Sequence, residues 1–136
     1  MPIYWKPNGG SWNNTGPSGF GELYDSDSCV AYKGYFLHSL LDDANGKKIV
    51  YKDICTLYSG GFQNGIMEGN FEVTVIAQQD WDMVTSIHGD QVAPGTKKQV
   101  VYSAGNPISE SGSVDVQLNV NYERDDDGYF LSISIV

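Results

Sequence analysis

The sequence is poor in positive charge. It has 8 Lys and Arg residues against 17 Asp and Glu, which gives a formal net charge of −9 at pH 7. A general nucleic-acid binder needs a basic surface, and the basic residues here are two Lys pairs, at 47–48 and 97–98, and scattered single residues. The composition therefore argues against nucleic acid as a partner, and it also disfavours attraction to anionic lipid.

Long apolar runs are missing as well. No stretch of the sequence approaches the ~18 apolar residues of a membrane helix. The N-terminus, MPIYWK, has no basic segment followed by an apolar one, as a signal peptide would. If Met1 is the natural start, we expect the protein to be cytoplasmic, with release by a non-classical route as the alternative.

Residue types that carry catalysis or bind zinc are scarce. The two cysteines, Cys29 and Cys55, have neither C-x-x-C nor metal-ligand spacing, and the sequence leaves open whether they form a disulfide. The two histidines, His38 and His88, are not tied by spacing to a nucleophile, and no G-x-S-x-G motif occurs. We therefore expect no enzyme, no cofactor and no zinc site.

Calcium is left open by two short acidic runs. Asp25 and Asp27, and the run Asp125–Asp127, are hard oxygen ligands in predicted turns. Neither run is an EF-hand loop, since no Glu follows at the required distance. The alternative interpretation is that these carboxylates are solvated and keep a sheet edge soluble.

What the sequence does have is a β-rich composition. It contains sixteen Gly, nine Tyr, five Phe and three Trp, and its length of 136 residues fits one domain with its own core. Short apolar segments spaced about 8–15 residues apart, with no amphipathic helix pattern and no internal repeat, are typical of all-β proteins. We predict a single-domain antiparallel β-sandwich with little or no helix over residues 1–136.

The elements follow from alternation and from Gly and Pro positions. Residues 1–28 hold three of the five Pro, so an irregular Gly/Pro-rich segment is predicted there. Strands are predicted at 29–41 with a kink at Gly34 (or a helical turn over 36–41), 48–57, 71–79, 98–103, and a clear hairpin of 114–123 with 129–135. Turns or loops are predicted at 42–46, 59–61, 64–65, 94–95 and 106–112, and 84–88 is strand or turn.

The stretch 71–85 changes character halfway. Its first half alternates as a strand, and its second half brings together amide, carboxylate, hydroxyl and indole groups: Gln78, Gln79, Asp80, Trp81, Asp82 and Thr85. Sugars present hydroxyls around an apolar C–H face, so several such groups converging would suit a glycan. The alternative is that Trp81 is core and the amides are solvated. Trp5 and Trp12, which flank an Asn/Gly turn, supply a second set of suitable residues.

The same stretch resembles the fungal fruit-body lectins, small cytosolic β-sandwich proteins with an actinoporin-like fold. Their loop reads roughly W-C-D-[IV]-V-T, and the run here is Trp81-Asp82-Met83-Val84-Thr85, with Trp displaced by one position. The segment 59–65, SGGFQNG, is similar to the family's Gly/Ser-rich segment. The resemblance covers residues from about 57 to 136 intermittently. The family's sugar-binding Arg has no counterpart, since the only Arg is Arg124.

The resemblance implies non-enzymatic glycan binding at two places. The first, for N-acetylglucosamine, would use Asp82, Met83, Val84 and Thr85. The second, for galactose or N-acetylgalactosamine, would use Ser59 and Gly60, with Gln78 and Gln79 near the positions of a His and an Asn. These residues and Trp81 are the candidate ligand-binding residues. The expected partners are glycans or glycoconjugates, and the expected form is a homo-oligomer.

Two other functions are kept as alternatives. The first is a membrane-active cytolysin of related fold, favoured by Trp and Tyr near the N-terminus and disfavoured by the lack of an amphipathic helix there. A cytolysin would bind the membrane directly. A lectin would have a membrane as its partner only through a glycolipid. The second is a structural or self-assembling protein, such as a phage or capsid component, in which the segment 1–28 embraces a neighbour.

Overall fold

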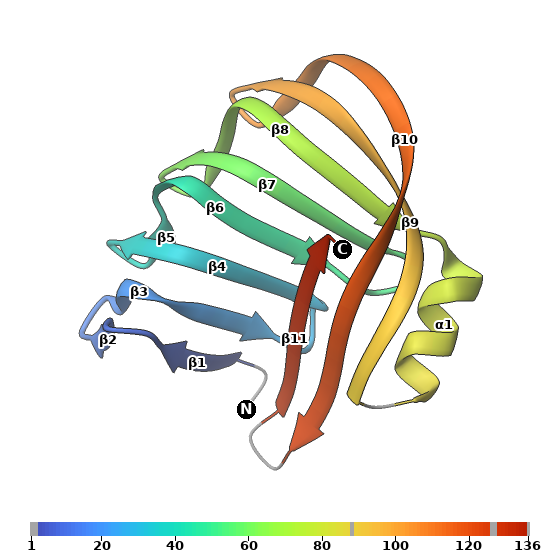
Figure 1. The fold of residues 1–136 in the computed structure, drawn as a ribbon. Helices are drawn as coiled ribbons and strands as arrows, with labels where there is room; N and C mark the ends of the chain where they lie inside the picture. Colours follow the sequence, from blue (N-terminus) through green and yellow to red (C-terminus); the bar gives the residue numbers. More distant parts are fainter. Residues whose placement is uncertain (1–2, 88, 126–127, 136) are drawn as a thin grey trace.

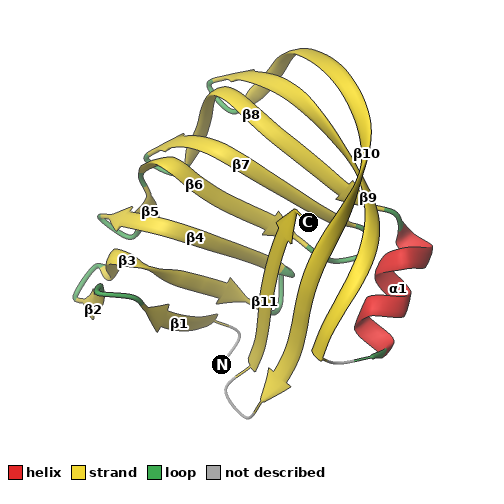
Figure 2. Ribbon diagram, viewed as in Figure 1, coloured by secondary structure: helices red, strands yellow, loops and turns green. Residues whose placement is uncertain are grey.

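The computed structural model describes residues 3–87, 89–125 and 128–135. In chain order its elements are β1 (Ile3–Pro7), β2 (Ser11–Asn13), β3 (Gly16–Asp25), β4 (Val30–Leu37), β5 (Leu40–Leu41), β6 (Asp43–Val50), β7 (Cys55–Gln63), β8 (Ile66–Ile76), α1 (Gln78–Ser86), β9 (Gly89–Ser103), β10 (Asn106–Asp125) and β11 (Gly128–Ile135). Figure 2 shows how strongly strand outweighs helix. The all-β prediction is confirmed.

All pairings are antiparallel and belong to one sheet. Its order is β1-β3-β4-β6-β7-β8-β9-β10-β11, with β2 attached to β3 and β5 attached to β4. The sheet curls, so that β10 and β11 cross in front of β4, β6 and β7 (Figure 1). The structure therefore shows one curled sheet, and it does not show the two separate sheets that the sandwich prediction implies.

The curl encloses the larger of two hydrophobic clusters. Its members come from the concave face of the sheet and from the C-terminal hairpin, and they include Tyr24, Ala31, Ile49, Leu57, Ile76, Leu118, Val120, Tyr122, Leu131 and Ile133. The hairpin predicted from alternation is confirmed, with a register that runs from Leu118 opposite Ile135 to Asp125 opposite Gly128. One face of the hairpin is apolar because it covers this cluster.

The second cluster lies on the other face of the sheet, over a row of glycines. Gly21 pairs with Gly34, Gly46 pairs with Gly60, and the neighbouring pair of Lys33 with Lys47 brings the two glycine pairs side by side. Large side chains occupy the space above these glycines, among them Trp5, Phe36, Leu41, Phe62 and Phe71. Glycines in mid-strand mark close approach or bending of a sheet. They explain how one sheet can have a core on both of its faces.

The prediction of an irregular segment over 1–28 is wrong, because β1, β2 and β3 lie there. Pro7 is tolerated because it ends β1, an edge strand, where a missing N–H costs little. Gly21 pairs with Pro7 and leaves room for the Trp5 ring. The Pro and Gly residues that indicated loop are therefore accommodated inside paired strands.

Other boundaries also differ from the predictions. The predicted turns and loops at 43–46, 59–61, 94–95 and 106–112 lie inside β6, β7, β9 and β10. Pairing with neighbouring strands overrides the local turn preference of Gly and Pro at these places. The predicted strand 48–57 is interrupted, because residues 48–50 end β6, 51–54 belong to no strand, and 55–57 begin β7. The turn at 64–65 is confirmed, with φ values of 51° and 79°, and the alternative helical turn over 36–41 is replaced by a tight turn at His38–Ser39.

Candidate functional site

The stretch predicted to be a binding loop is a helix. Residues 78–86 form α1, which begins after Ala77, and its inward residues Trp81 and Val84 are three positions apart and therefore share a face. Trp81 is 1% exposed, and its indole N–H donates to the Tyr51 carbonyl at 3.2 Å. Its ring packs edge-to-face on Tyr122 at 5.7 Å. Trp81 thus holds the helix on the sheet and is not available to a ligand, and Val84 is buried with it.

The remaining predicted residues of this stretch lie on the outward face of the helix or are bonded within it. The side of α1 that faces away from the sheet carries the exposed residues Gln78, Gln79, Asp82 and Met83. The Thr85 hydroxyl is hydrogen-bonded to the Asp82 carbonyl at 3.2 Å. Gln78 with Asp82, and Gln79 with Met83, are four positions apart and share the exposed face of α1, but none of the four lines the groove beside the helix.

The second predicted place is divided by the sheet. Ser59 and Gly60 are consecutive residues of β7, so they face opposite sides of the sheet. Ser59 is half-buried on the concave face, opposite Lys47. Gly60 lies beneath the Phe71 ring on the other face. The structure therefore does not bring these two residues together with Gln78 and Gln79 as one site.

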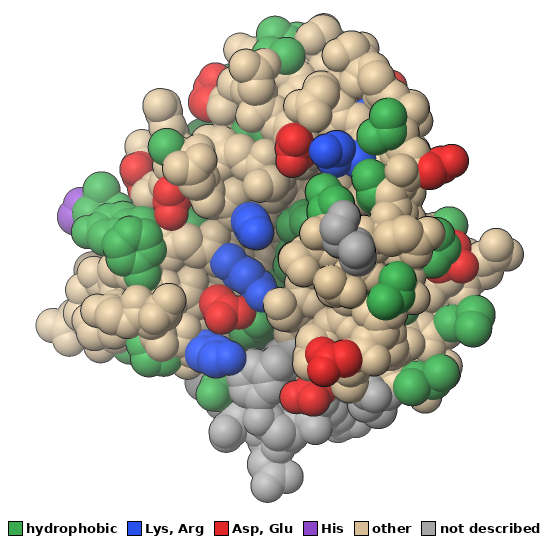
Figure 3. Space-filling model, viewed as in Figure 1, with side chains coloured by type: hydrophobic (Ala, Val, Ile, Leu, Met, Phe, Trp, Pro, Cys, Tyr) green, Lys and Arg blue, Asp and Glu red, His purple; other side chains and the backbone are tan. Residues whose placement is uncertain are grey.

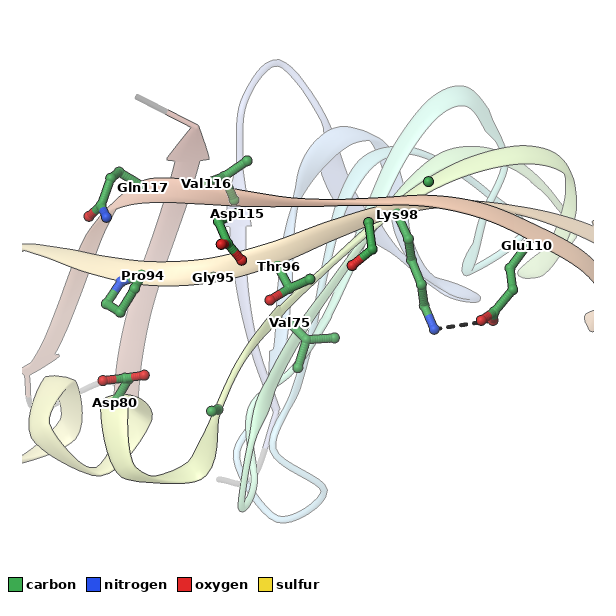
Figure 4. A pocket seen from close by; sticks show the side chains of 13 residues that line it. Val75, Asp80, Pro94, Gly95, Thr96, Lys98, Glu110, Asp115, Val116 and Gln117 are labelled. Carbon is green, nitrogen blue, oxygen red and sulfur yellow. Dashed lines mark hydrogen bonds and ion pairs between the residues drawn. The ribbon is translucent and has the colours of Figure 1, made fainter.

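An open groove of about 690 Å³ lies beside the start of α1 (Figure 4). Val75, Ala77 and Pro94 contribute apolar lining, and Asp80 from α1 and Asp115 from β10 extend toward it. A Lys98–Glu110 ion pair of 3.1 Å stands at one end. None of the thirteen described residues that line this groove is aromatic. It offers hydrogen-bonding groups but no ring for the apolar face of a sugar.

A different surface gathers both kinds of group, and it consists of four hairpin turns at one end of the sheet. These turns, 13–16, 37–40, 63–66 and 103–106, are called the tip surface below. They lie side by side: a Cβ at Gly65 would be 3.5 Å from Leu40, and a Cβ at Gly105 would be 3.6 Å from Ile66. A Cβ at Gly16 would likewise contact Ser39, so the turns 13–16 and 37–40 are also adjacent. The tip surface is therefore continuous.

Neighbouring turns are tied together by backbone bonds and carboxylates. Gly65 N–H donates to the Leu41 carbonyl at 2.7 Å and Gly105 N–H to the Met67 carbonyl at 3.0 Å. Asp42 accepts from the Asn64 N–H at 3.1 Å, and Glu68 accepts from the Ala104 N–H at 2.6 Å. These bonds position the turns before any ligand arrives, which lowers the entropy cost of binding.

The turns of the tip surface carry no Asp, Glu, Lys or Arg of their own, and the carboxylates of Asp42 and Glu68 beside them accept backbone hydrogen bonds from two of the turns. The sequence segments that build the tip surface, 7–21, 34–41, 54–67 and 99–109, contain no Asp, Glu, Lys or Arg. His38 is the one titratable imidazole in these segments. The same surface exposes large apolar side chains, which are Trp12, Leu37, Leu40 and Ile66 at the turns and Phe20 and Tyr35 beside them. In a protein of net charge −9, such a region is set apart from the rest of the surface.

Trp12 stands at the polar end of this surface. Its side chain is 56% exposed. The next three residues are polar, and Asn13 accepts hydrogen bonds from the Thr15 N–H and hydroxyl at 2.9 and 2.7 Å. Asn13, Asn14, Thr15 and His38 line a shallow hollow of about 480 Å³. The tip surface therefore carries an exposed ring and, on the residues that follow it in the chain, several amide and hydroxyl groups.

The turn opposite Trp12 is strained. His38 and Ser39 both have left-handed backbone conformations, with φ of 51° and 70°, which non-glycine residues adopt at a cost of roughly 1–3 kcal/mol each. The Ser39 hydroxyl is buried and has no hydrogen-bond partner among the described residues. Strain of this kind is often found at functional sites, and here it lies against the Trp12 end of the tip surface.

The other sequence predictions have mixed outcomes. Among the described residues, no group of three or more His, Cys, Asp or Glu could hold a metal ion. Asp25 uses its carboxylate to accept from the N–H groups of Asp27 and Ser28, whereas Asp126 and Asp127 lie outside the described residues. Cys29 and Cys55 are free thiols. Nor does any described helix have the length and apolar character needed to cross a membrane.

No protein-family model, curated protein or solved structure matches the chain. The resemblance to the fungal lectins therefore stays a prediction, and function has to be argued from the geometry. Sequence reasoning singled out Trp12 only as part of a secondary set with Trp5. Trp5 is half-buried and packs edge-to-face on Phe36 at 5.2 Å. The signal that distinguishes Trp12 is the absence of charge over residues 7–21, which can be read without a structure.

Proposed function

We propose that the protein is a non-enzymatic glycan-binding protein that contacts neutral saccharides through the tip surface. The observation that carries the proposal is the exposed Trp12 ring on the tip surface, where the three residues that follow it, Asn13, Asn14 and Thr15, line a shallow hollow. An aromatic ring covers the C–H face of a sugar, and the polar groups bind its hydroxyls. The binding residues differ from those predicted at 78–85, but the class of ligand is the same.

The lack of charge supports a neutral ligand. An anionic ligand would need positive charge at the site, and the segments that form the tip surface contain no Lys or Arg, while the Asp42 and Glu68 carboxylates beside them are engaged by backbone N–H groups. Each neutral hydrogen bond contributes only about 0.5–1.5 kcal/mol, so affinity for one sugar unit is expected to be low. Several turns in a row favour a ligand with several sugar units, because further units add contacts without a second association cost.

Calorimetric titration with neutral oligosaccharides that end in N-acetylglucosamine or galactose tests the proposal. Trp12→Ala should weaken binding about tenfold or more, which corresponds to 1.4 kcal/mol. Ile87→Ala is the matched control, because Ile87 is also apolar and 56% exposed but follows α1, away from the tip surface. Asp82→Ala should leave the affinity unchanged. Absence of binding by the wild type, or equal affinity of Trp12→Ala, would refute the proposal.

A second candidate is docking on a zwitterionic membrane. It is favoured by the exposed aliphatic side chains of Leu37, Leu40 and Ile66 on the uncharged tip surface. Aromatic and aliphatic residues on protruding turns suit the interface of a bilayer that does not repel the negative protein. Sedimentation with phosphatidylcholine vesicles, with and without competing oligosaccharide, separates the two candidates. Vesicle binding lost in Leu40→Ser but retained in Trp12→Ala would favour the membrane.

A further inference from the structure

The concave face of the sheet carries a row of lysines. In the strand registers Lys6 lies opposite Glu22, Glu22 opposite Lys33, Lys33 opposite Lys47, and Lys47 opposite Ser59. Alternation places this row on the same face as the larger core cluster, two residues beyond it on each strand. Figure 3 shows basic and acidic side chains gathered along the hollow between this part of the sheet and the C-terminal hairpin. A row with three lysines and one carboxylate is unusual in a protein of net charge −9.

Only part of this positive charge is balanced within the protein. Lys33 has a 19% exposed side chain, pairs with Glu22 at 3.0 Å, and donates to the Leu131 carbonyl. Glu22 also accepts from the Tyr24 hydroxyl at 2.5 Å. Lys47 is exposed and forms no ion pair with any described residue. Like charges directly opposite each other on paired strands are destabilising, so the pair of Lys33 and Lys47 favours an anion between them.

The acidic groups that face the row lie away from Lys47. Asp90 and Glu123 line the hollow together with Lys6, Glu22 and Lys33, and Asp90 accepts from the Asn121 amide at 2.7 Å. At the other end, Glu72 lies opposite Ser59 in the strand register and is paired with Lys97 at 3.6 Å. The uncompensated positive charge is therefore at Lys47, beside the Ser59 hydroxyl.

An aromatic pair lies on the same face next to this charge. Phe20 and Tyr35 are opposite each other, two residues along from Glu22 and Lys33, and their rings meet edge-to-face at 5.1 Å. Both rings are exposed. A ligand held at Lys47 could therefore place an apolar face on rings while its anionic group meets the lysines.

We infer that the Lys33–Lys47–Ser59 part of the concave face binds the anionic group of an acidic saccharide, such as a uronic acid. Lys47 would neutralise the carboxylate next to the Lys33–Glu22 pair, Ser59 would donate a hydrogen bond, and Phe20 and Tyr35 would contact the sugar ring. The saccharide part of this inference rests on the proposed function, whereas the anion part rests on the lysine row alone. This place shares the Phe20 and Tyr35 rings with the edge of the tip surface and differs from it in its lysines, which the segments of the tip surface lack.

Titration with oligogalacturonate, with a neutral oligosaccharide and with inorganic sulfate tests the inference. Oligogalacturonate should bind the wild type, and Lys47→Gln should weaken it about fivefold or more. Lys52→Gln is the matched control, because it removes the same charge from an exposed residue outside the row. Neutral oligosaccharide affinity should be the same in both variants, which distinguishes this site from the tip surface.

The outcomes are separable. Sulfate binding that depends on Lys47, without any oligogalacturonate binding, would overturn the saccharide assignment. Failure of both anions to bind, or an equal loss in Lys47→Gln and Lys52→Gln, would overturn the site itself. Binding of oligogalacturonate should also weaken as salt rises from about 50 to 300 mM, since exposed charges are screened. Circular dichroism of each variant confirms that the fold is retained.

Discussion

Replacing Gly60 by alanine tests the glycine row and, with it, the role that the lectin resemblance assigns to this residue. A Cβ at Gly60 would lie 2.8 Å from the Asn70 carbonyl oxygen and 2.8 Å from two atoms of the Phe71 ring. Phe71 is buried and itself packs edge-to-face on Phe62 at 5.3 Å, so the ring has little room to move. The clash is with backbone as well as with a buried ring, and it cannot be relieved by one rotamer change.

Overpacking of this kind costs about 1–3 kcal/mol. Contact with both backbone and a buried ring puts Gly60→Ala near the upper end, at about 2–3 kcal/mol. For a chain of this length the entropy of unfolding makes 1 kcal/mol worth roughly 3–4 °C, so the melting temperature should fall by roughly 7–10 °C. The measurement is thermal unfolding followed by circular dichroism.

The adjacent glycine is the control. A Cβ at Gly61 would be 3.3 Å from the Glu68 carbonyl oxygen and would meet no ring. Gly61→Ala should therefore change stability by less than about 1 kcal/mol, partly because alanine also restricts the unfolded chain. Equal melting temperatures for the two variants would refute the packing role of the glycine row. Loss of glycan binding in Gly60→Ala at unchanged stability would instead support the role implied by the resemblance.

Three further predictions concern the core and the buried charges. Trp81→Ala should lower the unfolding free energy by about 3–5 kcal/mol in urea titration, and a cost below about 1 kcal/mol would contradict its anchoring role. Burial raises the pKa of the Cys55 thiol, so in the native protein at pH 8 iodoacetamide should leave Cys55 unmodified while the half-buried Cys29 reacts, as mass spectrometry would show. Burial raises the pKa of Glu22, but the Tyr24 hydrogen bond and the Lys33 charge outweigh it, and the net pKa lies below 4.5. The stability due to this carboxylate is present above about pH 4.5 and is lost as the pH falls below it, so the urea midpoint of Glu22→Gln should depend less on pH between about 6 and 3 than that of the wild type.

Local patterns predicted those parts of the fold in which neighbouring residues decide the outcome. The C-terminal hairpin follows from strict alternation, and the turn at Asn64–Gly65 follows from residues that readily adopt positive φ. The segment 1–28 was predicted wrongly because Pro and Gly were taken as strand breakers. In the folded protein Pro7 ends an edge strand and Gly21 fits beneath a tryptophan, and neither circumstance is visible in the segment itself.

The candidate site likewise combines features that the sequence shows with features that only the folded structure shows. Trp81 and Asp82 are suitable for a sugar by residue type, and the sequence could not show that the strand ends at Ile76 and a helix turns Trp81 into the core. Trp12 is equally suitable by type, and its neighbours 7–21 are free of formal charge. Only the pairing of β2 with β3 and the contact of Gly16 with Ser39 bring it beside the other turns.

The sequence by itself determined the all-β class, the C-terminal hairpin and the low positive charge, because each depends on composition or on alternation within one strand. The tertiary structure decided which polar and aromatic groups meet. The tip surface joins turns from four parts of the chain, and the lysine row joins residues 6, 33 and 47 through strand registers. Registers are set by packing across the whole curled sheet, where a slip of one residue would turn every side chain to the other face. For that reason both proposed binding places became visible only once the strands were paired.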